Sequence, residues 1–310
     1  MSEEAQAVTA SGRTGRSWSS RNPLRAAAVY AAVYLGIAVA GNWLVPALPT
    51  ERGQLVGITV VSAAALLPVL LMVLSVCRLP LRARAEALWM VLMIAAFCLV
   101  RPTVLGIVGR LLGFPAAAAW SGRLSIVPQQ ELLGNLTLTL WAVFLGRLVS
   151  RVIREGKLLL PVAVVASVVD VITVLWGPVA AVSEKAPELA QTFSASTPVA
   201  PPPGMAAPVL AAIGLGDFLF LAVFLAVALR YAMNAAATMW ATWGVMLIAP
   251  AAFFVWPEAE GIPGIPFLAV AVLAVNWRYM KFAREERRAL VFTGILVAAV
   301  AAGVWAVVIR

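Results

Sequence analysis

The chain has 310 residues, of which 63% are hydrophobic and only 12% are charged, and its mean hydropathy is +0.96. A soluble protein of this length needs a charged surface that this composition does not supply, so we expect an all-α, polytopic membrane protein. The net charge is +9, but the basic residues stand in short clusters between apolar runs. This pattern is typical of membrane topology, and nucleic acid is therefore not an expected partner.

The absence of histidine removes several kinds of catalytic site. An imidazole base, a Ser-His-Asp triad and a His-ligated metal are all excluded. Cys77 and Cys98 have no CxxC arrangement and are expected to pack in or near membrane spans. We therefore expect no metal and no other cofactor.

Apolar stretches long enough to cross a bilayer, about 20 residues each, recur along the chain. The predicted transmembrane helices, about nine, cover residues 24–48, 54–77, 86–113, 132–153, 158–180, 205–230, 235–256, 262–278 and 289–309. The third stretch contains Arg101, Pro102 and Arg110. It forms either one long kinked span or a span followed by a re-entrant or second helix. Arg101 is expected to snorkel towards the membrane interface.

The basic clusters test the number of spans, because cytoplasmic loops carry an excess of Lys and Arg. These clusters lie at residues 13–25, 78–84, 147–157, 230 and 278–288. Nine spans with a cytoplasmic N-terminus place every cluster in the cytoplasm. A tenth span would put the 147–157 cluster outside, so nine spans are preferred. The connector at residues 183–204 then lies outside the cell.

Asp170 and Asp217 are the only aspartates in the chain, and each lies inside a predicted span. A carboxylate at membrane depth costs roughly 2.5–3.5 kcal/mol on insertion scales, so it indicates a functional site. Ser167 and Thr173 lie three residues to either side of Asp170. On a helix these three polar side chains share one face, which we expect to point into the protein.

The second aspartate is preceded by Gly214, which a continuous helix would place one turn away on the same face. Counted from the outer ends of their spans, both carboxyls are expected about 12–14 Å deep, at a rise of 1.5 Å per residue. Antiparallel neighbours could bring them level. Two adjacent carboxyls share one proton, so one can take a proton from water while the other polarises a peptide carbonyl.

The segment Gly214-Leu215-Gly216-Asp217-Phe218 resembles the GxGD signature of presenilins and signal peptide peptidases, the intramembrane aspartyl proteases. The residues around Asp170 resemble the preceding catalytic helix of that family, although Val169 stands where the family usually has Tyr. Pro263-Gly264-Ile265 stands at the place of the family's Pro-Ala-Leu motif. The resemblance covers about residues 158–278, and the N-terminal half is similar only in being helical.

This resemblance implies a presenilin-like fold and an intramembrane aspartyl endopeptidase, which hydrolyses peptide bonds within or near transmembrane segments of membrane proteins. Asp170 and Asp217 would be the catalytic pair. The residues expected to shape the active site and hold substrate are Gly214, Leu215, Gly216, Pro263, Gly264 and Ile265. The chain then divides into a disordered cytoplasmic tail (1–22), N-terminal transmembrane helices (23–155), a catalytic transmembrane core (156–280) and a C-terminal transmembrane helix (281–310).

A proton- or cation-coupled membrane transporter is the alternative, because intramembrane carboxylates also serve ion coupling. A transporter is expected to carry inverted repeats with broken helices in both halves, and the sequence shows no such pair. A catalytically inactive relative that binds membrane helices is a third hypothesis. The expected partners are transmembrane protein substrates and the lipid bilayer. The alanine-rich composition is typical of a GC-rich prokaryote, so we expect a multi-pass protein of the plasma membrane.

Overall fold

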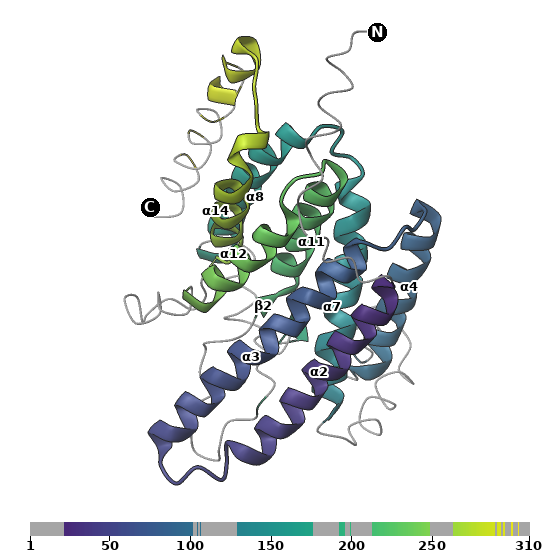
Figure 1. Cartoon of the computed structure of the whole chain (residues 1–310), viewed down its shortest axis with the longest axis vertical. Coiled ribbons are helices and arrows are strands. Elements are labelled where there is room, and N and C mark those ends of the chain that lie inside the picture. Colours follow the sequence, from purple (N-terminus) through teal and green to yellow (C-terminus); the bar gives the residue numbers. More distant parts are fainter. Residues whose placement is uncertain are drawn as a thin grey trace.

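The computed structural model describes residues 22–101, 129–175, 192–195, 213–248 and 263–288, together with a few single positions elsewhere. Within these residues the protein is all-α apart from one short pair of strands (Figure 1). The α-helices are α2 (Pro23–Leu44), α3 (Glu51–Cys77), α4 (Ala83–Val100), α7 (Gln129–Ser150), α8 (Leu159–Leu175), α11 (Leu215–Arg230), α12 (Ala235–Ile248) and α14 (Ile265–Asn276). The 3₁₀ turn η1 (Gly156–Leu158) precedes α8, and the 3₁₀ turn η4 (Trp277–Tyr279) follows α14.

Five helices of the described part are long and apolar enough to cross a membrane. They are α2, α3, α4, the segment Glu131–Ser150 of α7, and the segment Gly156–Val174, which contains α8. Large apolar side chains such as Val60, Leu88 and Val169 are exposed on the outside of the bundle. Such a surface is solvated by lipid rather than by water, which indicates a multi-pass membrane protein.

The predicted spans 24–48 and 54–77 agree with α2 and α3 to within a few residues. The end of the span 132–153 agrees in the same way with the end of α7, and the start of the span 158–180 with the start of α8; their other ends lie at or beyond the limits of the described residues. The predicted span 86–113 begins earlier, at Ala83, and its helix α4 ends at Val100. Most of residues 102–128 lie outside the described part, so the choice between one and two spans there stays open. The predicted tail and most of the last predicted helix also lie outside the described residues.

The helices pack in a definite order around a buried centre. Helix α2 pairs with α3, α4 pairs with α7, and α7 packs against α11, whose residues 221–228 are all buried. Helix α14 lies between α8 and α12 and also contacts α11. Gly146 permits the close approach of α7 to α11, because a β-carbon there would lie only 2.8 Å from Cβ of Ala222.

A two-stranded antiparallel ladder corrects the predicted helix 205–230. Strand β1 (Ser194–Ala195) pairs with β2 (Ile213–Gly214), with Ser194 opposite Gly214. The helix therefore begins only at Leu215, and the backbone of Gly214 is extended, with φ −67° and ψ 155°. The expected helical spacing between Gly214 and Asp217 is wrong. A β-branched residue followed by glycine has low helix propensity, whereas a carboxylate is favourable in a first helical turn.

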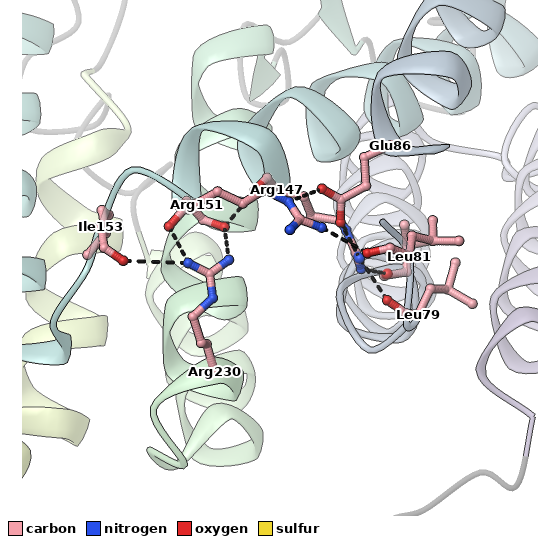
Figure 2. A network of polar contacts seen from close by, with 9 residues as sticks. Leu79, Leu81, Glu86, Arg147, Arg151, Ile153 and Arg230 are labelled. Carbon is pink, nitrogen blue, oxygen red and sulfur yellow. Dashed lines mark hydrogen bonds and ion pairs between the residues drawn. The ribbon is translucent and has the colours of Figure 1, made fainter. Parts of the chain in front are cut away.

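Arginines hold one end of the bundle together (Figure 2). Arg147 donates to Glu86 Oε1 through Nε at 2.9 Å and to the Leu79 carbonyl at 2.7 Å. Arg151 donates to the other Glu86 oxygen at 2.6 Å. Arg230, at the end of α11, donates to the carbonyl oxygen of Ser150 at the end of α7, at 2.7 Å.

A further ion pair joins Lys157, in η1, to Glu286, beyond α14. With the arginine contacts, it brings the loops near residues 79–86, 147–157, 230 and 283–286 to the same end of the bundle. The nine-span arrangement requires this grouping, since it places all of these basic loops on one side of the membrane.

Candidate active site

Asp217 is the third residue of α11 and closes the first turn of that helix. Its Oδ2 accepts a hydrogen bond from the backbone N–H of Gly214, the N-cap, at 3.0 Å. This contact is the return half of a capping box, in which a carboxylate satisfies an N–H that the helix cannot. The side chain is half-buried, so the carboxyl has a fixed orientation without being sealed off.

The strand pair holds the chain just before this turn. The N–H of Leu215, the first residue of α11, donates to the carbonyl of Phe193 at 3.0 Å. This bond extends the pairing of β1 with β2 by one residue into the start of the helix. Figure 1 shows β2 close to the end of α11 that carries Asp217. The GxGD segment is therefore a junction from strand to helix.

Asp170 lies on α8 and reaches the beginning of α14. Its Oδ2 accepts a hydrogen bond from the backbone N–H of Ile265 at 3.0 Å. Ile265 is the first residue of α14, so its N–H is one of the donors that have no acceptor within the helix. The positive end of the helix dipole at this point also favours a carboxylate. Asp170 thus caps α14 from a neighbouring helix.

Gly264 leaves space for the carboxyl of Asp217 at the start of α14. A β-carbon built on Gly264 would lie 2.8 Å from Cγ of Asp217 and 3.0 Å from its Oδ2. The dipeptide Gly264-Ile265 therefore lies against both carboxyl groups: Gly264 packs against Asp217, and Ile265 donates a hydrogen bond to Asp170. Both carboxyls therefore lie beside the start of α14. Residues from three helices, far apart in sequence, meet at this point.

Chain spacing places the three helices in register. The end of the bundle where the basic loops meet is called the basic end below. Three residues of the site each lie thirteen positions along the chain from a cation at this end: Asp170 from Lys157, Asp217 from Arg230, and Ile265 from Arg278. At a rise of 1.5 Å per residue, the site lies about 20 Å from the basic end. Both carboxyls are therefore at the same level along the bundle, although the predicted route to this conclusion, counting along a helix from Pro208, does not hold.

The other predicted site residues have different surroundings. Leu215 packs against the buried apolar cluster that contains Phe97 and Leu138. Gly216 is exposed, and a β-carbon there would meet no described atom within 4 Å. Pro263 is half-buried beside Gly264. Gly216, next to Asp217 in the chain, thus lies at an open surface, whereas the space beside Gly264 is filled by the Asp217 carboxyl.

Of the three side chains predicted to form a polar face on α8, two bond to the backbone of their own helix. Ser167 donates to the carbonyl of Ala163 at 2.7 Å, and Thr173 donates to the carbonyl of Asp170 at 3.2 Å. Both hydroxyls are therefore satisfied by the backbone of their own helix. They do not require a protein or water environment, and Asp170 is the member of the three that does.

Sequence reasoning missed the strand residues Phe193, Ser194 and Ala195. They lie in the serine- and proline-containing connector, which carries no strand pattern, and their pairing with residues 213–215 depends on the fold. Among the described residues there is no group of three or more His, Cys, Asp or Glu side chains that could hold a metal ion. The chemistry of the site is that of two carboxyls and backbone N–H groups.

No family model, curated protein or solved structure matches this chain.

Proposed function

We propose that the protein is an intramembrane aspartyl endopeptidase of the presenilin and signal peptide peptidase type. The observation that carries this proposal is the shared position of two carboxyls at the start of α14. Asp170 accepts the N–H of Ile265, while Asp217 lies against Gly264. The meeting of two carboxyls at one backbone segment supports a catalytic pair rather than two separate structural contacts.

The pair supplies both the base and the acid of a peptide hydrolysis. Neighbouring carboxyls in a low-dielectric site hold one proton between them. The ionised carboxyl takes a proton from water as the water oxygen attacks the peptide carbonyl carbon, and the protonated carboxyl donates its proton to the carbonyl oxygen. As the C–N bond breaks, the first carboxyl gives the proton that it took from water to the leaving amine, and the second takes a proton from a hydroxyl of the diol, which restores both to their starting state. The backbone donors of Gly214 and Ile265 each hold one carboxyl oxygen, which fixes the orientation of both groups.

The substrate class follows from the depth of the site. About 20 Å from the basic end, the carboxyls lie where another protein presents a transmembrane helix. The peptide carbonyls of such a helix are engaged in its own hydrogen bonds, so the helix must unwind locally before attack. The exposed backbone of Gly216, next to Asp217, is the expected approach for an unwound segment. With the basic loops in the cytoplasm, the connector between α8 and α11 lies outside, and we expect substrates whose N-terminus is cytoplasmic.

The test is cleavage of a single-span substrate in reconstituted liposomes. Asp170→Asn and Asp217→Asn each keep an oxygen acceptor for the backbone N–H, so both variants are expected to fold. Each is expected to lose cleavage by at least roughly 10³-fold, as for removal of a general acid or base. Glu51→Gln, which changes an exposed carboxylate at the start of α3, serves as the control. Cleavage by either aspartate variant at the control rate would refute the proposal.

The same liposomes separate the protease from the transporter. A coupled transporter is expected to carry protons or cations across the membrane in a manner that requires both aspartates. The protease is expected to show a bell-shaped pH profile of cleavage and no such flux. Reporter fusions at Ser194 and Arg284 test the orientation, and a cytoplasmic Ser194 would contradict it.

A further inference from the structure

Phe97 joins the N-terminal helices to the strand pair. It lies near the end of α4, and only 2% of its surface is exposed. Its ring centroid lies 6.4 Å from that of Trp141 on α7 and 6.0 Å from that of Phe193, with interplanar angles of 49° and 44°. These tilted arrangements are the ones that aromatic pairs prefer. Phe97 thus bridges α7 and the residue that precedes β1.

From Phe193 the contacts continue to Asp217. The Phe193 carbonyl accepts the N–H of Leu215, and the Leu215 side chain packs in the same apolar cluster as Phe97. Gly214, paired with Ser194, donates its N–H to the carboxyl of Asp217. Phe97 therefore contacts Phe193, the residue that leads into the strand, and belongs to the apolar cluster against which a side chain of the first turn of α11 packs.

Side-chain packing has to hold this ladder, because strands of two residues are not stable by themselves. Ala195 of β1 also belongs to the Phe97 cluster. Phe193 is 40% exposed, so its described packing is on the side that faces Phe97. A smaller side chain at position 97 would leave a gap behind β1.

We propose that Phe97 is a positioning residue that, through β1, sets the carboxyl of Asp217 against the start of α14. This inference rests on the proposed protease function. It assigns a catalytic consequence to the N-terminal half of the chain, which shares no motif with the resembled family. Phe97 acts through Phe193 and Leu215 and does not touch the carboxyl itself.

The primary variant is Phe97→Leu, with Phe144→Leu as the matched control. Phe144 also lies between α4 and α7, is 5% exposed, and stacks on Trp89 at 6.2 Å, but it lies on α7 towards the basic end. Both variants are expected to lower the unfolding temperature similarly. Only Phe97→Leu is expected to lower kcat, by roughly 10- to 100-fold as for a small misplacement of a catalytic group, with KM nearly unchanged.

A cross-link across the ladder provides the rescue. Ala195 and Ile213 are paired, and paired Cα atoms about 5.5 Å apart suit a disulfide. In a background without Cys77 and Cys98, the pair Ala195→Cys and Ile213→Cys is expected to form this bond. Its oxidation should restore most of the kcat lost in Phe97→Leu, and reduction should remove the restored activity. A merely structural loss would not respond to the redox state of this bond.

The rate of disulfide formation is a second readout that needs no activity. It is expected to fall several-fold in Phe97→Leu and to stay unchanged in Phe144→Leu. Equal rates in the two variants, or a loss of kcat that oxidation does not restore, would overturn the positioning role. An inactive wild type that still shows the slower cross-linking in Phe97→Leu would instead overturn the protease function while retaining the anchoring of the ladder.

Discussion

Gly264 lies so close to Asp217 that no side chain fits between them. A β-carbon at position 264 would lie 2.8 Å from Cγ of Asp217. The backbone of Gly264 has φ −82° and ψ −32°, which any residue can adopt, so glycine is needed here for space and not for conformation. Pro263 and Pro266 restrict the chain on either side. The start of α14 is therefore a rigid surface against which the carboxyl of Asp217 packs.

Gly264→Ala is expected to reduce cleavage by roughly 10- to 100-fold, because a catalytic group displaced by about 1 Å loses activity on this scale. The added methyl group must displace either the Asp217 carboxyl or the start of α14, which also donates to Asp170. The substitution introduces the alanine of the family's Pro-Ala-Leu motif, yet it opposes the geometry of this chain. Cleavage of a single-span substrate in liposomes measures the effect.

Gly244→Ala is the matched control for that variant. Gly244 lies in α12, and a β-carbon there would meet no described atom within 4 Å. Alanine is expected to leave cleavage unchanged and to stabilise the helix by about 0.5–1 kcal/mol. Full activity of Gly264→Ala would show that the carboxyl moves without consequence, and the proposed pairing would then be wrong.

The amide of Ile265 reports the contact with Asp170 directly. This N–H begins a helix, so its protection from hydrogen exchange depends on the Asp170 carboxyl. A hydrogen bond to a charged group contributes about 1.5–3 kcal/mol. Exchange at Ile265 is therefore expected to accelerate by at least roughly tenfold in Asp170→Ala. The amide of Leu268, bonded to the Gly264 carbonyl, should keep its protection, and equal acceleration at both amides would indicate unfolding of α14 instead.

The long helices could be predicted because lipid leaves a spanning chain few alternatives. Without water, each backbone group must find a partner, and an apolar run of about 20 residues does so only as a helix. The ends of α2 and α3 accordingly agree with the prediction to within a few residues. Local signals also mark these ends: Asn22 caps α2 and Thr50 caps α3. These features are encoded within a few positions of each boundary.

The first turn of α11 could not be predicted in the same way. Ile213 and Leu215 continue an apolar run, so the pattern suggested an unbroken span. The strand at Ile213–Gly214 exists because β1, about twenty residues earlier, pairs with it. No local pattern specifies that pairing. The resemblance to a GxGD motif predicted Asp217 as a site residue, but the part of Asp217 in closing a helical turn depends on where the helix begins.

The approach of Gly264 to Asp217 also required the structure. Two prolines near a glycine predict a rigid helix start, and their position after a long apolar segment is visible in the sequence. Which carboxyl that helix start faces depends on the packing of α14 between α8 and α12. Conversely, the equal spacing of thirteen residues from each site residue to a cation was present in the sequence. This spacing indicates a common level for the three site residues only once the fold shows that the cations lie at the same end of the bundle.

The buried pair of Glu86 and Arg147 is expected to stabilise the basic end of the bundle strongly. Glu86 and Arg147 are 2% and 5% exposed. Glu86→Leu would leave Arg147 buried without its counter-charge, at a cost of about 3 kcal/mol or more. Thermal unfolding in detergent should show a large decrease in midpoint. Adding Arg147→Met is expected to recover part of it, since the unpaired charge is then absent; an additive further decrease would contradict this view.

The ion pair beyond α14 should respond to acid. The hydrogen bond from Lys157 lowers the pKa of Glu286, and the N–H of Ala283, which donates at 2.8 Å, lowers it further. Because the folded pKa lies below the unfolded value, this contact stabilises the protein above the ordinary carboxyl pKa. Its contribution is lost as pH falls through the lowered value.

Lys157→Met is expected to raise the pKa of Glu286 towards the ordinary carboxyl range, as measured by NMR titration of labelled glutamate. The effect on unfolding should be small, since the pair is solvent-accessible. A Glu286 titration that Lys157→Met leaves unaltered would show that the two loops do not meet in solution.

Gly146→Ala tests the contact that supports α11 along its length. The added methyl group would lie 2.8 Å from Cβ of Ala222 and 3.2 Å from the backbone N of Val223. Overpacking of this kind costs about 1–3 kcal/mol, and the backbone atom cannot move without moving the helix that carries Asp217. Gly36→Ala, where an added β-carbon meets no described atom within 4 Å, is the control.

Thermal unfolding should separate the two variants. Adding Ala222→Gly to Gly146→Ala should recover only part of the loss of stability, because the backbone contact remains. Equal midpoints for the two single variants would mean that α7 and α11 are held further apart, and that the position of Asp217 does not depend on their contact.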